Sequence, residues 1–256
     1  MCELLGFSAG KKQNILEYLE LFFAHSVRHP HGWGMMYEQN TERMHLKEPC
    51  QACTSKMLRH RLSDFPEQHV AIAHIRFATV GSVRTENCHP YYGTDSSGRM
   101  WTLVHNGTIY SGRNLTKYLE KQHGDTDSER IFLYLLEEMN RAISVSGRGL
   151  TDAERFRIVE QTVISLASRN KLNLLIYDGD LLYVHKNMKG TLHYLQKPDS
   201  ILFATEKLTT EDNWQSYPLA KLCAFRDGHS VLEGTEHGNI FVPNLESITK
   251  AAAMHI

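Results

Sequence analysis

Two segments near the middle of the chain carry strong helix-start signals, and strand-like segments lie on both sides of them. Thr126 and Glu129 have the spacing of a capping box, and Thr151 and Glu154 repeat that spacing. Apolar residues at helical spacing follow each start, and we expect these to face a core: Ile131, Leu135, Met139, Phe156, Val159, Val163, Leu166 and Ala167. Any fold for this chain must therefore place a central helix pair between two groups of strands.

The segments around the helix pair read mainly as strands. Before it, strands are predicted at 2–9, 32–38, 44–48, 69–77 and 100–106, with shorter helices after the first strand and at 55–65. After it, strands are predicted at 171–177, 180–185, 201–206, 221–226 and 230–234, with Asp-Gly turns at 178–179 and 227–228. This order indicates an α+β fold in which two sheets pack face to face under outer helices. No linker or repeat divides the sequence, so we expect a single domain over residues 1–256.

Charge and hydropathy narrow the class of protein. The chain has 28 Lys and Arg against 29 Asp and Glu, a formal net charge of -1, which argues against a broad nucleic-acid-binding face. No apolar run approaches the roughly 18 residues that cross a bilayer. We therefore expect a cytoplasmic protein that binds neither nucleic acid nor membrane.

The cysteines and histidines give weak signals for metal binding. The chain has five cysteines and no secretory signal, which favours free thiols over disulfides. Cys50 and Cys53 form a C-x-x-C without a second pair, so redox or zinc use is the less favoured alternative. His29 and His31 flank Pro30, and a solvated loop is favoured over a ligand pair. No metal and no cofactor are predicted.

Three segments carry polar groups that a buried strand does not need. Arg76 ends a strand and could grip a carboxylate, whereas Asn106 and Gly107 follow another strand and could donate to an oxyanion. Asp127 stands in the first turn of a predicted helix. Each also has a purely structural explanation. Arg76 could form a surface ion pair, Asn106 and Gly107 could form a hairpin turn, and Asp127 could be a favourable charge at a helix start. Together with Cys2, directly behind the initiator Met, they favour a catalytic site.

In order and spacing, the motifs "MC", "HIRFATVGSVRTENCHP", "HNG" and "TDSE" resemble the glutaminase domain of class II glutamine amidotransferases, in particular a stand-alone bacterial branch. The resemblance covers nearly the whole chain. It implies the four-layer αββα sandwich of N-terminal-nucleophile hydrolases, with two antiparallel sheets between helical layers.

The resemblance also implies a role for each matched residue. Cys2, exposed by removal of Met1, would be the nucleophile with its own α-amine as general base, and Asn106 and Gly107 would form the oxyanion hole. The residues implied to bind substrate are Arg76 at the α-carboxylate of glutamine, Asp127 at its α-ammonium, and Phe77, Thr79, His89 and Trp33 around the site, with Trp33 on a loop near the nucleophile. Phe77 and Val80 stand where better-known members have Trp and His. The backbone contribution at Phe77 should survive, whereas loss of the His at position 80 is expected to alter substrate affinity or choice.

The chemistry fits a single residue that carries both base and nucleophile, because an α-amine and a thiol titrate within about one pH unit of each other. The expected substrate is a small molecule, glutamine or another γ-glutamyl compound, and the expected reaction is hydrolysis of glutamine to glutamate and ammonia. Two alternative functions stay open: a γ-glutamyl amide or peptide hydrolase, and a glutamine-binding regulatory module without turnover. A separate acceptor or synthase subunit that takes the ammonia is an expected possible partner. A homodimer also stays open.

Overall fold

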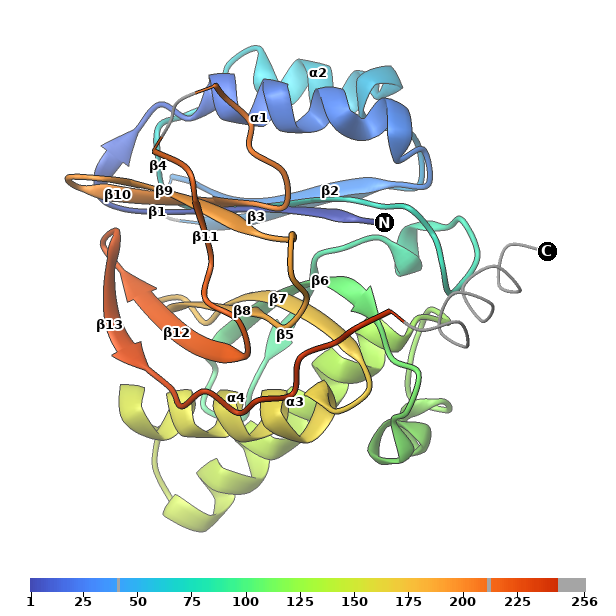
Figure 1. Cartoon of the computed structure of the whole chain (residues 1–256), viewed down its shortest axis with the longest axis vertical. Coiled ribbons are helices and arrows are strands. Elements are labelled where there is room, and N and C mark those ends of the chain that lie inside the picture. The colour runs from blue at the N-terminus through green and yellow to red at the C-terminus, as the bar shows by residue number, and fades with distance from the viewer. Residues whose placement is uncertain (41, 211–212, 244–256) are drawn as a thin grey trace.

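The computed structural model describes residues 1–40, 42–210 and 213–243, and its two sheets lie face to face between two pairs of helices (Figure 1). Within these residues the first sheet has seven strands, in the order β11 (Gln215–Ser216), β9 (His193–Lys197), β10 (Ser200–Ala204), β1 (Glu3–Gln13), β4 (Gln68–Ile75), β2 (Trp33–Gln39) and β3 (Glu42–Glu48). The second, over the same described ranges, has six: β13 (His229–Glu233), β12 (Lys221–Arg226), β8 (Leu182–Lys186), β7 (Lys171–Tyr177), β6 (Met100–Thr108) and β5 (Tyr91–Thr94). Neighbouring strands pair antiparallel in both sheets.

Helices cover the outer face of each sheet. The first sheet lies under α1 (Leu16–Ala24) and α2 (Lys56–Leu62), and the second lies against α3 (Asp127–Ser146) and α4 (Asp152–Ala167) (Figure 1). Short 3₁₀ helices connect the elements: η1 (His25–Arg28), η2 (Ala52–Thr54), η3 (Thr85–Asn87) and η4 (Arg113–Tyr118). The predicted αββα sandwich is confirmed. None of the helices that the structure describes is long and apolar enough to cross a bilayer.

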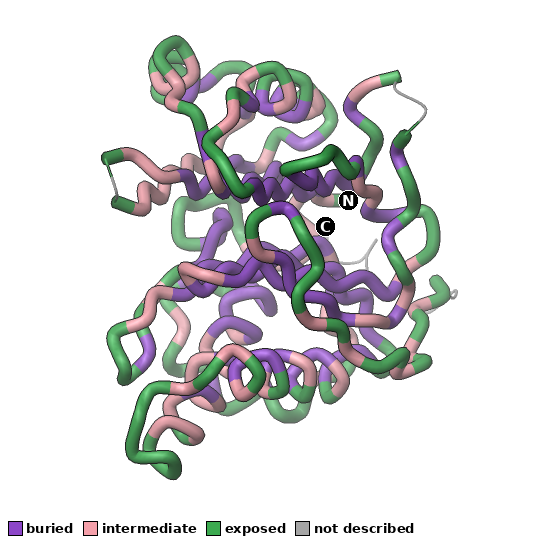
Figure 2. The backbone as a smooth tube through the Cα atoms, turned by 90° about the vertical axis from the view of Figure 1, so that its left-hand side faces the viewer, coloured by how far each residue is buried: buried purple, intermediate pink, exposed green. Residues whose placement is uncertain are grey.

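Alternation along the strands divides the apolar side chains among three layers of core. In β1, Leu4 points into the layer between the sheets, whereas Leu5 and Phe7 point to the layer under α1 and α2. Figure 2 shows the buried residues concentrated along the strands at the centre of the molecule. Both faces of each sheet are covered, which explains why the central strands read as nearly continuous apolar runs. All the inward positions that the sequence predicts for α3 and α4 are buried.

The strand boundaries differ from the prediction at one functionally important place. Asn106 and Gly107 do not follow a strand; they lie inside β6, where they pair with Asn173 and Leu172 of β7. The ladder continues to Thr108 opposite Lys171, so the Asn-Gly pair makes no turn here. The tertiary pairing overrides the local turn preference of Asn-Gly.

The last described segment returns to the edge of the second sheet near the chain start. Residues 235–243 follow β13, and their backbone is fixed by hydrogen bonds from His237 N to Ala220 O (3.0 Å) and from Phe241 N to Asn187 O (2.8 Å). The Phe241 ring stacks on Tyr110, which follows β6, with 5.6 Å between ring centroids and 4° between ring planes. Met1 and Phe241 line the same pocket, so segments from the start and from the end of the described chain lie close together.

Candidate active site

Cys2 lies where β1 begins, beside the end of β4. The antiparallel register pairs Glu3 with Ile75, so the residues after β4 fall next to the thiol. The Phe77 N–H donates to the Cys2 Sγ at 3.3 Å, and the Phe77 carbonyl lies 3.4 Å from the same sulfur. The Phe77 backbone therefore contacts the Cys2 thiol through both its N–H and its carbonyl; its contribution to substrate binding stays a prediction.

Burial raises the pKa of the Cys2 thiol above its usual value. The Phe77 hydrogen bond, the N-terminal ammonium, Arg76 and Lys171 act in the opposite direction by stabilising the thiolate. Burial also lowers the pKa of the α-amine, which Met1 carries here. Burial therefore favours the neutral forms of both the amine and the thiol. At the sulfur, the surrounding cations oppose this effect because they favour the thiolate.

A small cavity of about 20 Å³ connects Cys2 with most of the predicted site residues. Its lining includes Cys2, Arg76, Phe77, Thr79, His89, Gly107 and Asp127. Asn106 lies at the adjoining pocket, which shares Thr79 and Gly107 with this cavity. Residues from four separate stretches of the chain thus meet at one place, as the motif analysis predicts.

Arg76 is buried and holds the loop that follows it. Its guanidinium donates to the backbone carbonyls of Val80, Gly81 and Ser82 at 2.9 to 3.0 Å. Thr79, in the same loop, lies 3.4 Å from Thr108 between their hydroxyl oxygens. Arg76 is therefore the support of the loop at 80–82 as well as a cation beside the cavity.

Asn106 supplies an unused donor at the site. Its side chain is 1% exposed, and within the described part of the chain its Nδ2 has no hydrogen-bond partner. The amide is oriented from its other end, because Lys171 Nζ donates to Asn106 Oδ1 at 2.9 Å. A buried donor without a partner is costly, and a bound substrate oxygen would satisfy it.

Gly107 is required by close packing. A Cβ at this position would collide with the carbonyl oxygen of Lys171 and with the His105 ring. Only glycine lets the backbone next to Asn106 approach the neighbouring strand this closely. Gly107 is therefore required for strand packing, and together with Asn106 it also forms a candidate pair of hydrogen-bond donors.

Lys171 is the site residue that the motif analysis missed. It begins β7, is 4% exposed, and has its pKa lowered to about 8 by burial, while Cys2 acts in the opposite direction. Nothing in the local sequence marks it, since a Lys at the start of a strand usually faces solvent. Only the pairing of β6 with β7 brings it to Asn106.

Asp127 is fixed at the first turn of α3. Its Oδ2 accepts from the Ile109 N–H at 2.7 Å, which ties the helix start to the end of β6. The side chain is 4% exposed and lines the cavity. This position leaves the carboxylate available to a cation in the cavity.

His89 lies under the cavity, against other aromatic rings. Its ring centroid is 4.0 Å from that of His74 and 4.8 Å from that of Tyr91. Burial lowers the pKa of His89 well below its usual value, and His74, His105 and Arg76 act in the same direction. His89 is thus a neutral wall of the site at neutral pH.

The structure places Trp33 outside the cavity, which corrects the expected loop position near the nucleophile. Trp33 begins β2, is fully buried, and packs edge-to-face on Phe23 of α1. Its indole N–H donates to Glu48 Oε2 at 3.2 Å. The alternation of β2 directs this ring to the helical side of the sheet, away from Cys2.

The His-Pro-His stretch is a turn, as predicted, but only Pro30 is exposed and the solvated part of the prediction fails for His29. His29 is buried, with its Nδ1 2.9 Å from the His25 carbonyl. The Ala78 N–H donates to His31 Nδ1 at 2.9 Å, and the His31 ring lies 5.2 Å from that of Phe77. These histidines support the segment that follows Arg76.

One group of side chains has metal-ligand chemistry, but it is already charge-compensated. Ligand atoms of Glu3, His25 and Glu206 lie within 4.8 Å of one another. Arg28 lies between the two carboxylates, 3.6 Å from Glu3 and 2.8 Å from Glu206, and His25 Nδ1 is 2.8 Å from Glu3. The arrangement is an ion-pair network beside the nucleophile.

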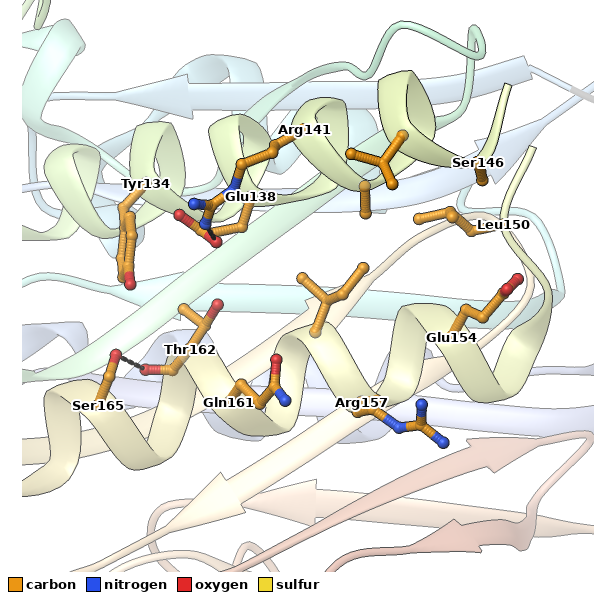
Figure 3. A pocket seen from close by; sticks show the side chains of 13 residues that line it. Tyr134, Glu138, Arg141, Ser146, Leu150, Glu154, Arg157, Gln161, Thr162 and Ser165 are labelled. Atoms are coloured by element: carbon orange, nitrogen blue, oxygen red, sulfur yellow. Dashed lines mark hydrogen bonds and ion pairs between the residues drawn. The ribbon is translucent and has the colours of Figure 1, made fainter. Parts of the chain in front are cut away.

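A larger pocket of about 670 Å³ lies on the outer helical layer, and its lining differs chemically from that of the cysteine site. Figure 3 shows it between α3 and α4, with Glu138, Arg141, Gln161 and Thr162 among its walls. It contains neither a cysteine nor a paired oxyanion donor. The residues that the motifs single out line the smaller cavity instead.

Comparison with known proteins identifies the family of the chain. A family model described as "Glutamine amidotransferases class-II" matches residues 1–199. The chain belongs to this family. Its relatives include an uncharacterized protein of Methanocaldococcus jannaschii, 27% identical over 90% of this chain and 71% of that protein. Another is YafJ of Escherichia coli K12, provisionally named a glutamine amidotransferase, 29% identical over 77% of this chain and 76% of YafJ.

Solved structures of the family share the fold. A Pseudomonas aeruginosa protein described as a predicted glutamine amidotransferase superposes with a TM-score of 0.62, at 21% identity, over 90% of this chain and all of that one. Glutamine phosphoribosylpyrophosphate amidotransferase of Bacillus subtilis gives 0.65 at 17% identity, over 91% of this chain and 49% of that enzyme. The sandwich of two antiparallel sheets is thus the family fold, and this chain spans about half of the larger enzyme.

Proposed function

We propose that this protein is a glutaminase of the class II amidotransferase type, in which Cys2, after removal of Met1, attacks the γ-carboxamide of glutamine. The observation that carries the proposal is the buried, unpartnered Nδ2 of Asn106 close to a cavity that Cys2, Arg76 and Asp127 share. Binding alone would need only the charged pair. An idle buried donor near a thiol is what an acyl-transfer reaction uses.

The reaction follows from the groups around the cavity. The α-amine of Cys2 takes the thiol proton, and the sulfur forms a bond with the side-chain carbonyl carbon of glutamine. The carbonyl oxygen becomes an oxyanion that Asn106 Nδ2 and the Gly107 N–H stabilise. The ammonium of Cys2 then returns its proton to the leaving nitrogen, the C–N bond breaks, and ammonia departs. Water hydrolyses the remaining thioester, which yields glutamate and restores the thiol.

Substrate orientation is assigned to charge. Arg76 faces the α-carboxylate and Asp127 faces the α-ammonium, so the carboxamide is directed toward Cys2. Arg76 keeps its bonds to the loop carbonyls while it does so, because a guanidinium has more donors than those bonds use. The released ammonia passes to water or to a separate acceptor subunit.

The test measures glutamate and ammonia released from glutamine by the N-terminally processed protein. Cys2→Ala should abolish turnover, and a variant with residues added before Cys2 should be inactive although it keeps the thiol. Asn106→Ala should lower kcat by about 100-fold with little change in melting temperature. Full activity of Cys2→Ala would exclude this mechanism.

A glutamine analogue with a reactive diazoketone separates catalysis from simple binding. The enzyme should become covalently modified at Cys2, as detected by mass spectrometry of the intact protein. Glutamine binding without modification or turnover would instead identify a regulatory module.

A further inference from the structure

A second pocket adjoins Asn106 and Gly107, the oxyanion donors of the proposed function. It has a volume of about 220 Å³ and shares Thr79 and Gly107 with the catalytic cavity. We call it the Lys171 pocket; its walls include Asn106, Lys171, Tyr110, Met188 and Phe241. In the proposed function Asn106 and Gly107 face the scissile carbonyl and the glutamyl head group lies toward Arg76 and Asp127, so the Lys171 pocket is left for the group beyond that carbonyl.

The pocket is far larger than ammonia requires. A molecule the size of water occupies about 30 Å³, so release of ammonia leaves most of this space unused. Met1 is another wall of the pocket, and its removal would widen the space. The volume therefore fits a leaving group of several non-hydrogen atoms.

The walls of the Lys171 pocket are apolar and held in place. Tyr110 and Phe241 stack with parallel rings, and Met188 and Pro243 extend the apolar lining. Hydrogen bonds hold the backbone of both residues: Tyr110 N donates to Asn170 Oδ1 at 2.7 Å, and Phe241 N donates to Asn187 O at 2.8 Å. Such a surface suits an aliphatic or aromatic side chain.

The charge in the pocket is unbalanced. Lys171 is 4% exposed, and no carboxylate of the described residues pairs with it. Its two hydrogen-bond acceptors in that part of the chain are Asn106 Oδ1 and the Met1 sulfur, and the second leaves with Met1. Cys2 is the group whose negative charge would favour the ammonium, and that charge is lost once the sulfur bonds to the substrate carbonyl. A carboxylate from the substrate would then pair with the buried ammonium.

From this cation, volume and lining, we infer that the Lys171 pocket is a leaving-group subsite for γ-glutamyl amino acids, an inference that rests on the proposed function of Cys2. The carboxylate of the leaving amino acid pairs with Lys171, and its apolar side chain lies against Tyr110, Met188 and Phe241. The glutamyl head group occupies the Arg76 and Asp127 side.

The chemistry needs no further reactant. The Cys2 sulfur bonds to the γ-carbonyl carbon, the amide C–N bond breaks, and the Cys2 ammonium protonates the leaving amine. A free amino acid departs, and water hydrolyses the thioester to glutamate. The difference from glutamine hydrolysis is only the group attached to the departing nitrogen.

The first experiment compares three substrates with the processed wild-type protein: glutamine, γ-glutamylphenylalanine and γ-glutamylphenethylamine. The last two differ only in the carboxylate. We expect kcat/KM for γ-glutamylphenylalanine to exceed that for γ-glutamylphenethylamine by about tenfold or more, because a hydrogen-bonded charge pair is lost in the latter. Equal values for the two amides, or hydrolysis of glutamine alone, would overturn the subsite and leave the glutaminase proposal intact. Failure to hydrolyse all three would overturn both.

The second experiment fills the pocket without touching the catalytic groups. Met188→Trp should lower kcat/KM for γ-glutamylphenylalanine about tenfold and leave that for glutamine within about twofold of wild type. Met188→Leu is the matched control and should preserve both activities. If Met188→Trp lowers neither activity, or both equally at an unchanged melting temperature, the subsite assignment is wrong.

Discussion

The two long helices, α3 and α4, begin with the same Thr-x-x-Glu pattern, yet the side chains of their first turns bind different partners. At α4 the full capping box forms: Thr151 Oγ1 accepts from Glu154 N, and the Glu154 carboxylate accepts from Thr151 N at 2.8 Å. At α3 only the first half forms, with Thr126 Oγ1 accepting from Glu129 N at 3.2 Å. The Glu129 carboxylate instead accepts from His123 N and Gly124 N, both at 2.7 Å.

Burial explains the difference. The first turn of α3 is buried at Thr126, Asp127, Ser128 and Glu129, whereas Thr151 at the start of α4 is exposed. The α3 turn bonds groups outside the helix: Thr126 contacts the Tyr91 hydroxyl at 2.6 Å, and Asp127 holds Ile109 N. A helix start that bonds the rest of the protein can position a site, and one that bonds itself mainly stabilises its own helix.

The turn before α3 also reaches the loop that Arg76 supports. Asp125 accepts from Ser82 N at 3.3 Å and from Asn87 Nδ2, and Asn87 Oδ1 accepts from Asp125 N at 2.9 Å. Glu129 fixes residues 123 and 124 beneath this contact. The start of α3 is therefore connected to both sides of the cavity.

Among the tests of the contrast between the first turns of α3 and α4, the largest expected effect is the loss of activity on substitution of Asp127. Asp127→Asn keeps an oxygen acceptor for Ile109 N but removes the charge, so kcat/KM for glutamine should fall about 100-fold with little change in melting temperature. Steady-state kinetics and thermal unfolding would check this. Asp152→Asn, at the same helix position in α4, is the matched control and should leave activity unchanged.

Glu129→Gln should affect stability more than any change in the α4 box. In the variant, one of the two N–H groups of His123 and Gly124 faces the amide nitrogen of the Gln side chain and loses its acceptor. This should lower the free energy of unfolding by about 2 kcal/mol. Urea unfolding would measure it. A loss in kcat/KM should accompany it, because the turn beneath Asp125 loosens; unchanged stability would show that the α3 turn is not fixed by this carboxylate.

The two threonine caps should differ in the same direction. Thr151→Ala should lower the free energy of unfolding by about 1 kcal/mol, the usual cost of a lost cap. Thr126→Ala should cost more, because it also leaves the buried Tyr91 hydroxyl without its partner. Equal costs in denaturant unfolding would contradict the distinction between the two helix starts.

The smallest expected effect is the pH dependence of the α4 box. Hydrogen bonds from Arg148, and then from Thr151, lower the pKa of Glu154 to about 2 from an ordinary value of 4.5. A lowered folded-state pKa stabilises the protein above the unfolded value, and that contribution is lost as pH falls from about 4.5 to 2. The melting-temperature difference between wild type and Glu154→Gln should shrink over this window. Because the carboxylate is at the surface, added salt should reduce the difference as well.

The fold could be predicted from the sequence to a large extent. Helix starts at Thr126 and Thr151 and strands such as β1, β4 and β7 depend on local caps and on runs of apolar residues that a covered sheet requires. Strands such as β9 escaped prediction because half-exposed His193 and charged Lys197 give it no apolar pattern. The pairing of β6 past Asn106 and Gly107 was also missed, since a long-range ladder decides it.

The sequence alone determined which chemical groups are present and their order: a leading cysteine, an arginine after a strand, an Asn-Gly pair and an acid at a helix start. Only the tertiary structure decided how they are oriented. Strand alternation turned Trp33 away from Cys2, the β6–β7 register brought Lys171 to Asn106, and burial made one Thr-x-x-Glu turn part of the site and left the other at the surface. The physical reason is that residue type and spacing act over a few neighbours, whereas register, burial and charge pairing depend on residues far away along the chain.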